Sequence, residues 1–292
     1  MNTVSIKSRI PWHLKIISKI ILSRIPVGYK FWQRMGLFRH GEMDKADYAL
    51  KVFKTHVSQA NIKDKLRNKT LLELGPGDSI ASAIIAKSYG AKIILVDTGN
   101  YADANIDIYQ PLIKKLLDKN LSPPSLENLK NLSDLLKLCD AKYLTSGLNS
   151  FRDIDNESID FIYSHAVLEH IRKHEFLDLM HECERVLKPN GTASHQIDLR
   201  DHLGGGLNNL RFSENIWESN FFSNSGFYTN RIQFSKMVDL FESANFSVLV
   251  TNIERWDEMP TPRKNLAAEF RTLPEQELNV YSFAVVLSKT NG

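Results

Sequence analysis

An apolar run that ends in two closely spaced glycines constrains the fold of this chain more than any other stretch. Residues 70–79 read T-L-L-E-L-G-P-G-D-S, and a helical pattern follows from Ile80 to Tyr89. The next apolar run, Lys92–Val96, ends in Asp97. A strand, a tight glycine turn, a helix and a second strand make up the βαβ half of a nucleotide-binding fold. We therefore expect an α/β protein built on a parallel sheet.

The residues around the glycine turn indicate the kind of ligand. Gly75 and Gly77 let the backbone bend sharply and approach a ligand closely. Asp97 would stand at the carboxyl end of the second strand, where a carboxylate can accept both hydroxyls of a ribose. A dinucleotide fingerprint needs a third glycine where Ile80 stands, so that class of cofactor is disfavoured. Glu73 would repel a pyrophosphate, whereas its charge suits a cationic ligand that carries an amino group.

Three motifs follow one another along residues 73–192. E-L-G-P-G at 73–77 is followed by the acid at 97, and D-N-E-S-I-D-F-I-Y at 155–163 leads into V-L-E-H at 167–170. The third motif is R-V-L-K-P-N-G-T at 185–192. Their order and sequences resemble those of the class I S-adenosylmethionine-dependent methyltransferases, and in particular small-molecule methyltransferases of type 11. The resemblance spans roughly residues 70–200.

The resemblance implies a Rossmann-like sheet of seven strands in the order 3-2-1-4-5-7-6, with helices on both faces. It also implies S-adenosylmethionine as cofactor and S-adenosylhomocysteine as product. We expect a basic, helical N-terminal extension or cap over residues 1–66 and the methyltransferase domain over residues 67–292. Within that domain a polar and aromatic stretch at about 200–231 is expected to form a lid-like insert.

The resemblance assigns the cofactor to residues at the ends of the first four strands: Glu73, Gly75, Pro76, Gly77, Asp97, Thr98, Gly147, Leu148, Ser164 and His165. The sequence departs from the family pattern after the third strand, where many relatives carry an acid that binds the adenine amino group. Here the matching stretch, 145–148, reads T-S-G-L. Backbone groups or Ser146 would then contact the adenine.

Histidines near the ends of the fourth and fifth strands are the candidate catalytic groups. An oxygen acceptor of high pKa needs a general base, and histidine titrates near neutrality. The candidates are His170, His165 and His195, the last oriented by Asp198 or Asp201. The alternative for each histidine is a helix cap or a hydrogen bond in the core.

The end of the fifth strand and the insert supply the candidate acceptor-binding residues, because open α/β sheets bind substrates at the carboxyl ends of their strands. These residues are Glu169, Asp198, Asp201, His202, Arg211, Trp217 and Tyr228. The alternative for the insert is a surface excursion with a small core of its own. A magnesium-like ion held by His165, Glu169 and the acids and histidines near 195–202 is a weaker interpretation, and we predict no metal.

Charge is distributed unevenly along the chain. The net charge is +3, yet the first 41 residues contain eight bases and no acid. Residues 11–25 combine lysines and an arginine with apolar residues at helical spacing. Such a segment either packs as a cap that helps cover the cofactor or lies on an anionic membrane surface. We therefore allow for peripheral membrane contact through residues 1–40 of a protein expected in the cytoplasm.

Several other classes are disfavoured. No apolar run approaches the length that spans a bilayer, and lysines and arginines interrupt the apolar stretches near the start. S-H-A-V stands after the fourth strand, where nucleic-acid methyltransferases carry an N-P-P-Y-type tetrapeptide, so we expect no nucleic-acid partner. Cys139 and Cys183 are expected to be free thiols in a reducing compartment.

These observations favour O-methylation of a small-molecule, sugar or glycan, or lipid-linked acceptor. Two alternatives stay open. The first is an N-methyltransferase of a small metabolite. The second is a catalytically silent scaffold that keeps the cofactor-binding fold and binds a partner.

Overall fold

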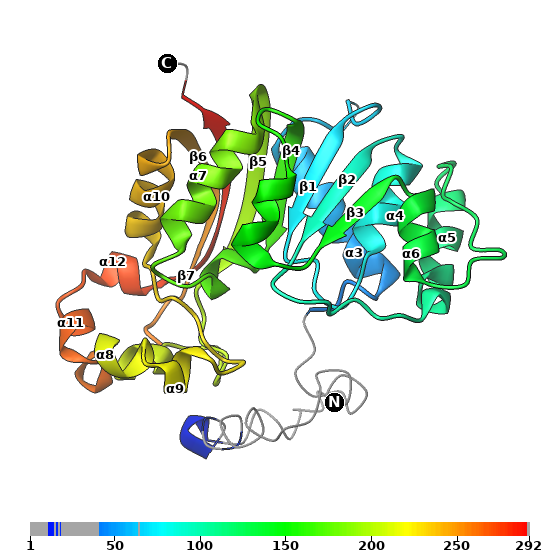
Figure 1. The fold of residues 1–292 in the computed structure, drawn as a ribbon. Coiled ribbons are helices and arrows are strands. Elements are labelled where there is room, and N and C mark those ends of the chain that lie inside the picture. The colour runs from blue at the N-terminus through cyan, green and yellow to red at the C-terminus, as the bar shows by residue number, and fades with distance from the viewer. Residues whose placement is uncertain (1–10, 15, 17, 19–40, 64, 291–292) are drawn as a thin grey trace.

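The computed structural model describes residues 11–14, 16, 18, 41–63 and 65–290. A twisted sheet of seven strands runs through the described residues in the order β3-β2-β1-β4-β5-β7-β6, with helices on both faces (Figure 1). This confirms the predicted class I methyltransferase topology. The strands are β1 (Thr70–Leu74), β2 (Lys92–Val96), β3 (Ala141–Leu144), β4 (Ile159–His165), β5 (Leu187–Asp198), β6 (Phe246–Arg255) and β7 (Val280–Lys289).

Strands β1 to β5 pair in parallel, whereas β7 runs antiparallel to both β5 and β6. The carboxyl ends of the five parallel strands therefore meet at one edge of the sheet, the lower edge in Figure 1. Ligands of open α/β sheets bind at this edge.

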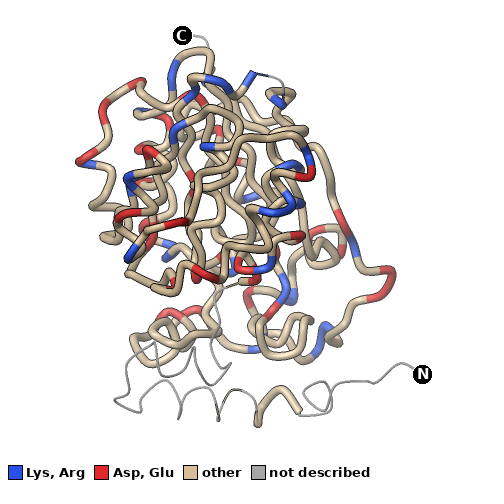
Figure 2. The backbone as a smooth tube through the Cα atoms, turned by 90° about the vertical axis from the view of Figure 1, so that its right-hand side faces the viewer, with Lys and Arg blue, Asp and Glu red and all other residues tan. Residues whose placement is uncertain are grey.

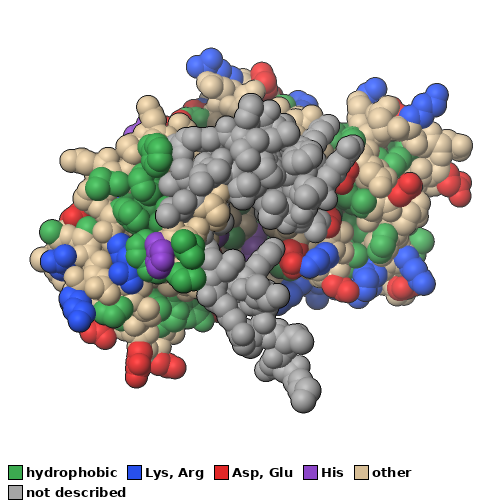
Figure 3. Space-filling model, turned by 90° about the horizontal axis from the view of Figure 1, so that it is seen from below, with side chains coloured by type: hydrophobic (Ala, Val, Ile, Leu, Met, Phe, Trp, Pro, Cys, Tyr) green, Lys and Arg blue, Asp and Glu red, His purple; other side chains and the backbone are tan. Residues whose placement is uncertain are grey.

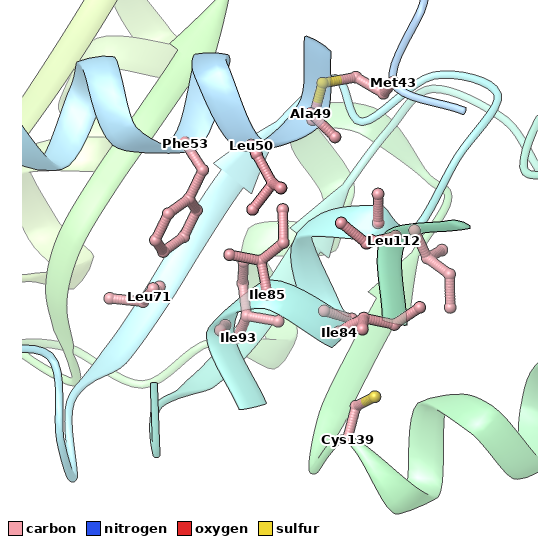
Figure 4. Packing of buried hydrophobic residues seen from close by; sticks show 14 of the residues in the cluster. Met43, Ala49, Leu50, Phe53, Leu71, Ile84, Ile85, Ile93, Leu112 and Cys139 are labelled. Atoms are coloured by element: carbon pink, nitrogen blue, oxygen red, sulfur yellow. The ribbon is translucent and has the colours of Figure 1, made fainter. Parts of the chain in front are cut away.

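The first face of the sheet is covered by four helices: α3 (Ala46–Gln59), α4 (Ala81–Ser88), α5 (Gln110–Leu117) and α6 (Leu132–Leu138). Helix α3 buries Ala49, Phe53 and Val57, which recur every four residues and so form one stripe. Figure 4 shows its Leu50 and Phe53 pointing toward Leu71 of β1 and the neighbouring core. Helix α3 therefore packs into the main core, although we predicted it as part of the extension over residues 1–66.

The second face carries α7 (Phe176–Val186) and α10 (Phe234–Ser243), which pack on the side chains that alternate with those of the first face. In β1, for example, Leu71 belongs to the first core and Leu72 to the second. Because β1 is buried on both sides, its leucines do not alternate with exposed polar residues, as is usual for a central parallel strand. Short 3₁₀ helices lie in the segments between strands: η2 (Ile106–Tyr109), η3 (Gly147–Asp153) and η4 (Leu168–His170).

The predicted insert forms a satellite at the carboxyl edge. It contains η5 (Asn208–Arg211), α8 (Glu214–Trp217) and α9 (Asn220–Ser223). Trp217 is fully buried there among other aromatic side chains, and Trp12 and Ile16 join the same cluster. The insert thus has the small core of its own that the alternative predicted. Most of the predicted amphipathic helix at 11–25, and the basic patch after it, lie outside the described residues.

A second satellite packs beside the insert. It gathers η6 (Arg263–Asn265), α11 (Ala268–Arg271) and α12 (Glu275–Leu278) around Leu266 and Leu278. Helix α12 ends at Leu278, and β7 begins two residues later at Val280.

Other sequence expectations concern thiols, membrane spans and charge. Cys139 and Cys183 are buried free thiols. Within the described ranges, no helix has both the length and the apolar character needed to cross a membrane. Figure 2 shows positively and negatively charged residues interspersed along the described backbone rather than gathered by sign.

Candidate active site

The glycine turn after β1 adopts the conformation that the sequence predicts. Gly75 and Gly77 have φ angles of 65° and 66°, a region that side chains rarely occupy. A Cβ atom on Gly75 would lie 2.6 Å from Cγ2 of Val167, which follows β4. The turn is therefore packed directly against the exit of the neighbouring strand.

Asp97 is joined to this turn by hydrogen bonds. The Gly77 N–H donates to its Oδ2 at 2.9 Å, and the Thr98 N–H donates to its Oδ1 at 2.7 Å. The carboxylate is half-buried at the end of β2. Two backbone N–H donors thus hold the carboxylate in a fixed orientation beside the glycine turn.

The turn after β3 completes this part of the edge. Gly147 has a φ of 56°, and its N–H donates to the Asp97 carbonyl oxygen at 2.8 Å. A Cβ atom on Gly147 would stand 3.4 Å from the Thr98 side chain. The structure therefore brings together four cofactor residues predicted from the sequence, Gly77, Asp97, Thr98 and Gly147, while Pro76 is buried and Leu148 half-buried beside them.

Glu73 is predicted from the sequence to be a charged group that suits a cationic ligand, but the structure buries its side chain. It is only 4% exposed, and the hydroxyls of Ser82 and Tyr163 lie beside its carboxyl. Burial raises the pKa of Glu73 to about 8, the neighbouring hydroxyls opposing the change and Asp97 adding to it. At pH 7 the carboxyl is therefore mainly protonated, and its attraction for a cation is weaker than predicted.

His165 is the candidate base that lies closest in register to the glycine turn. Ser164 pairs with Leu74, so His165 stands at the level of Gly75. Its ring is half-buried, and Nδ1 lies 3.3 Å from Nε2 of His56. Burial and the Lys51 charge lower the pKa of His165, so the imidazole is neutral at pH 7.

The structure does not support the predicted roles of His195 and Ser164. His195 is completely buried, its ring stacks on Phe241, and burial lowers its pKa to about 3. Its Nδ1 lies 2.7 Å from the Ser164 hydroxyl, which is also completely buried. Both side chains point into the core of the second face, away from His165.

His170 and His202 form a second histidine site at the exit of β4. The His170 Nδ1–H donates to the Tyr228 carbonyl oxygen at 2.9 Å, and the two Nε2 atoms lie 3.1 Å apart. The rings stack with centroids 4.8 Å apart, and both residues are exposed. His170, which the sequence predicts to be catalytic, and His202, which it predicts to bind the acceptor, are thus neighbours.

The two candidate acids after β5 are bound locally and do not orient His195. Asp198 forms an ion pair with Arg200, with 2.7 Å between Oδ2 and Nη2. Asp201 is buried, and its carboxylate accepts hydrogen bonds from five backbone N–H groups of the loop that follows it. Asp201 therefore organises the glycine-rich loop, which corrects its predicted contact with the acceptor.

The insert residues predicted to bind the acceptor mainly contact one another. Trp217 donates its Nε1–H to the Thr229 carbonyl oxygen, and the Tyr228 hydroxyl donates to Glu218. The Arg211 guanidinium lies over the Trp12 ring, 4.9 Å from its centroid. Trp217 and Tyr228 are buried, so they hold the insert together and do not line an open acceptor surface.

Glu169 is also buried, at 1% exposure, and lines a small cavity with Asn209 and Arg231. Neither of its carboxyl oxygens makes a hydrogen bond of good geometry with a described residue. Burial raises the pKa of Glu169 well above its ordinary value. The cavity lies beneath the insert, so the predicted direct contact between Glu169 and an acceptor is not supported.

Metal binding was the weaker interpretation of the histidines and acids near this edge. Within the described part of the chain, no group of three or more His, Cys, Asp or Glu side chains is arranged to hold a metal ion. Figure 3, which looks onto the carboxyl edge, shows histidine side chains at this face beside hydrophobic ones.

Sequence reasoning missed three residues behind His165. His56 and Gln59 belong to α3, and Ser194 belongs to β5. The His56 side chain is completely buried, although the helix is amphipathic and this position lies on its apolar stripe. A histidine on the apolar stripe of a predicted amphipathic helix was the sequence signal that could have pointed to His56.

Residues 72–194 match the model of the family described as "Methyltransferase domain". A search of the curated proteins gave no match. The match shows a methyltransferase domain at residues 72–194, and the strand order is that of the Rossmann-like class I methyltransferase fold.

Similar solved structures include three proteins of low sequence identity. Phosphoethanolamine N-methyltransferase 2 from Haemonchus contortus, in complex with S-adenosylmethionine, is 14% identical with a TM-score of 0.42, and the match covers 77% of this chain and 49% of that one. This chain therefore spans about half the length of that relative. YcgJ from Bacillus subtilis is 14% identical (TM-score 0.42, covering 81% and 98%). PH0226 from Pyrococcus horikoshii is 11% identical (TM-score 0.44, covering 90% and 100%).

Proposed function

We propose that the protein is an O-methyltransferase that acts on a small-molecule, sugar or glycan, or lipid-linked acceptor. The observation that carries this proposal is the position of His165. It is a neutral, half-buried imidazole at the end of β4, level with the glycine turn that follows β1. An O–H acceptor needs such a base, whereas silent scaffolds do not.

The residues at this edge fit S-adenosylmethionine. Asp97 would accept the ribose hydroxyls, because two backbone N–H groups hold its carboxylate in a fixed orientation at the end of β2. The left-handed turn at Gly75 and Gly77 lets the backbone run close to the amino-acid part of the cofactor. Gly147 and Leu148 would border the adenine through backbone and apolar contacts, because no acid is present there.

Methyl transfer needs positioning and removal of one proton. When bound, S-adenosylmethionine supplies a methyl group on a positively charged sulfur, which leaves as the neutral thioether when the acceptor oxygen takes the methyl. His165 would take the hydroxyl proton at Nε2 and become imidazolium, so that charge is conserved. Holding acceptor and base in line contributes a further share of the rate.

Calorimetric titration of the full chain with S-adenosylmethionine tests the cofactor site. Transfer of a radioactive methyl group to a panel of hydroxylated metabolites, glycans and lipid-linked sugars then tests the reaction. We expect H165Q to bind the cofactor but to lose at least a hundredfold in transfer rate. H181Q, which replaces an exposed histidine of α7, is the matched control.

The outcomes separate the alternatives. Binding without transfer to any acceptor class favours the catalytically silent scaffold. Transfer only to amines favours N-methylation of a small metabolite. If H170Q abolishes transfer and H165Q does not, the base is the His170–His202 pair and the assignment of His165 is wrong.

The lipid-linked choice among these acceptors is supported by charge and by apolar exposure. The first 41 residues carry eight bases and no acid. Leu14, Ile216 and Phe221, which belong to the N-terminal segment and the insert that it contacts, are each about half exposed. Flotation with anionic vesicles should therefore retain the full chain and release a variant with Lys15, Lys19 and Arg24 changed to Gln. If the two proteins float equally, the proposed membrane contact through these basic residues is wrong.

A further inference from the structure

His165 is the last member of a line of hydrogen bonds that starts on α3. Gln59 Oε1 lies 3.2 Å from the Ser194 hydroxyl, and that hydroxyl lies 2.8 Å from Nδ1 of His56. Nε2 of His56 lies 3.3 Å from Nδ1 of His165. The line therefore joins helix α3 to β5 and then to the exit of β4.

The chemistry of the first member fixes the direction of every later bond. The Gln59 carbonyl oxygen can only accept, so the Ser194 O–H donates to it. The Ser194 oxygen then has lone pairs left and accepts the proton of His56 Nδ1. A neutral imidazole carries one N–H, so His56 Nε2 is an acceptor and takes its hydrogen bond from Nδ1–H of His165. His165 Nε2 is left with its lone pair.

Burial keeps the middle of this line neutral. His56 is completely buried, and burial lowers its pKa well below the ordinary value, with His165 and His195 adding to the effect. His56 therefore stays an acceptor at Nε2 over the physiological range.

The other groups that face His165 do not compete for its Nδ1. The Tyr48 ring meets it edge-on, with 6.0 Å between centroids. The charges of Lys51 and Asp198 act on His165 in opposite directions. The tautomer is therefore decided by the bond to His56.

We propose that Gln59, Ser194 and His56 position His165 as the catalytic base by holding it in the Nδ1–H tautomer, with Nε2 unprotonated. The inference rests on the proposed function, because a base is needed only if a hydroxyl acceptor is methylated. His165 is then the catalytic residue, and the other three are positioning residues. They fix which ring nitrogen of His165 carries the proton. They need not contact the acceptor to do so.

Nitrogen NMR of the full chain labelled with ¹⁵N-histidine measures the tautomers directly. The nine histidines can be assigned with single H→Q variants. We expect His56 and His165 both to carry their proton on Nδ1, the form that free imidazole side chains populate less. Protons on Nε2 of both residues in the wild-type protein would overturn the proposal.

S194A tests the direction of the line. Without the hydroxyl, His56 Nδ1–H has no acceptor in a buried site, so His56 should move its proton to Nε2 and donate it to His165. His165 should then become the Nε2–H tautomer. S164A removes the corresponding hydroxyl from His195 on the opposite face and should leave the His165 tautomer unchanged. An unchanged His165 tautomer in S194A would also contradict the proposal.

Gln59 is half-buried, so its substitution tests the first member with little risk to folding. Q59L removes the one acceptor that the described residues offer the Ser194 hydroxyl and should reverse both tautomers, whereas Q59E keeps a carboxylate acceptor and should preserve them. Because these spectra need neither cofactor nor acceptor, they are independent of the calorimetric titration. The predicted tautomers without cofactor binding would refute the proposed function alone, and cofactor binding with Nε2–H at His165 would refute the positioning line alone.

Discussion

Glu73 provides a direct test of the electrostatics beneath the glycine turn. Its pKa rises from 4.5 to about 8 in the folded protein because the carboxyl is buried. Between these two values the unfolded chain has lost the proton while the folded chain keeps it. The folded state therefore loses stability as pH rises, by up to about 1.4 kcal/mol per pH unit.

The size of this effect follows from the two pKa values. Below pH 4.5 the carboxyl is protonated in both states and costs nothing. The cost is about 1 kcal/mol at pH 5 and about 3 kcal/mol at pH 7, and it approaches about 5 kcal/mol above pH 8. The variant E73Q places a neutral group of the same shape at this site. Its free energy of unfolding should therefore lack the pH dependence that Glu73 contributes. Relative to the wild type, E73Q should gain about 2 to 3 kcal/mol between pH 5 and pH 7.

Urea denaturation of both proteins at pH 5, 6, 7 and 8, without cofactor, measures the difference. Taking the difference at each pH cancels the titration of all other groups. E258Q, which deletes an exposed carboxylate, controls for the loss of one negative charge from the chain. If the gap between E73Q and the wild type is the same at pH 5 and pH 8, Glu73 titrates alike in both states and the reasoning from burial is wrong.

Three further substitutions test individual parts of the site. D97N should weaken S-adenosylmethionine binding by about tenfold to a hundredfold in calorimetry, because a charge-assisted hydrogen bond contributes about 1.5 to 3 kcal/mol. G75A should lower the free energy of unfolding in urea by more than G205A does. Both positions have positive φ, but only at Gly75 would the new Cβ meet Val167, since nothing lies within 4 Å of the position at Gly205. D201A should release the N–H groups of Leu203, Gly204, Gly206 and Asn208 to rapid hydrogen exchange, because their common acceptor, the Asp201 carboxylate, is lost; unchanged protection there would contradict this.

The fold was predictable because its signals are local. A glycine turn between an apolar run and a helix specifies the first βαβ unit through the φ angles of Gly75 and Gly77. The position of Asp97 at the end of the second strand was predictable because it directly follows the apolar run Lys92–Val96. Packing contacts between segments that are far apart in the sequence were not predictable in this way. Helix α3 seemed to belong to the N-terminal extension because only its packing on Leu71 and Ile85 shows that it covers the sheet.

The insert shows why composition alone misplaced part of the site. Aromatic and polar residues build a small satellite core as readily as they line an acceptor pocket, and Trp217 and Tyr228 do the former. Asp201 was also misjudged, although an acid just before three glycines has an ordinary local explanation. Its carboxylate accepts the N–H groups of the turn, as short acidic side chains commonly do.

The choice among the histidines depends on register, which the sequence does not show. The dipeptide Ser-His ends β4 at 164–165 and recurs in β5 at 194–195. Ser164 pairs with His195, so these two side chains share the second face, where both are sealed in the core. Alternation then places His165 and Ser194 together on the first face, where His56 lies between them. If β5 were shifted by one residue, its side chains would change faces and His195 would join His165 on the first face. The candidate base is therefore set by the pairing of β4 with β5, and helix α3 supplies the partner that makes His165 differ from His195.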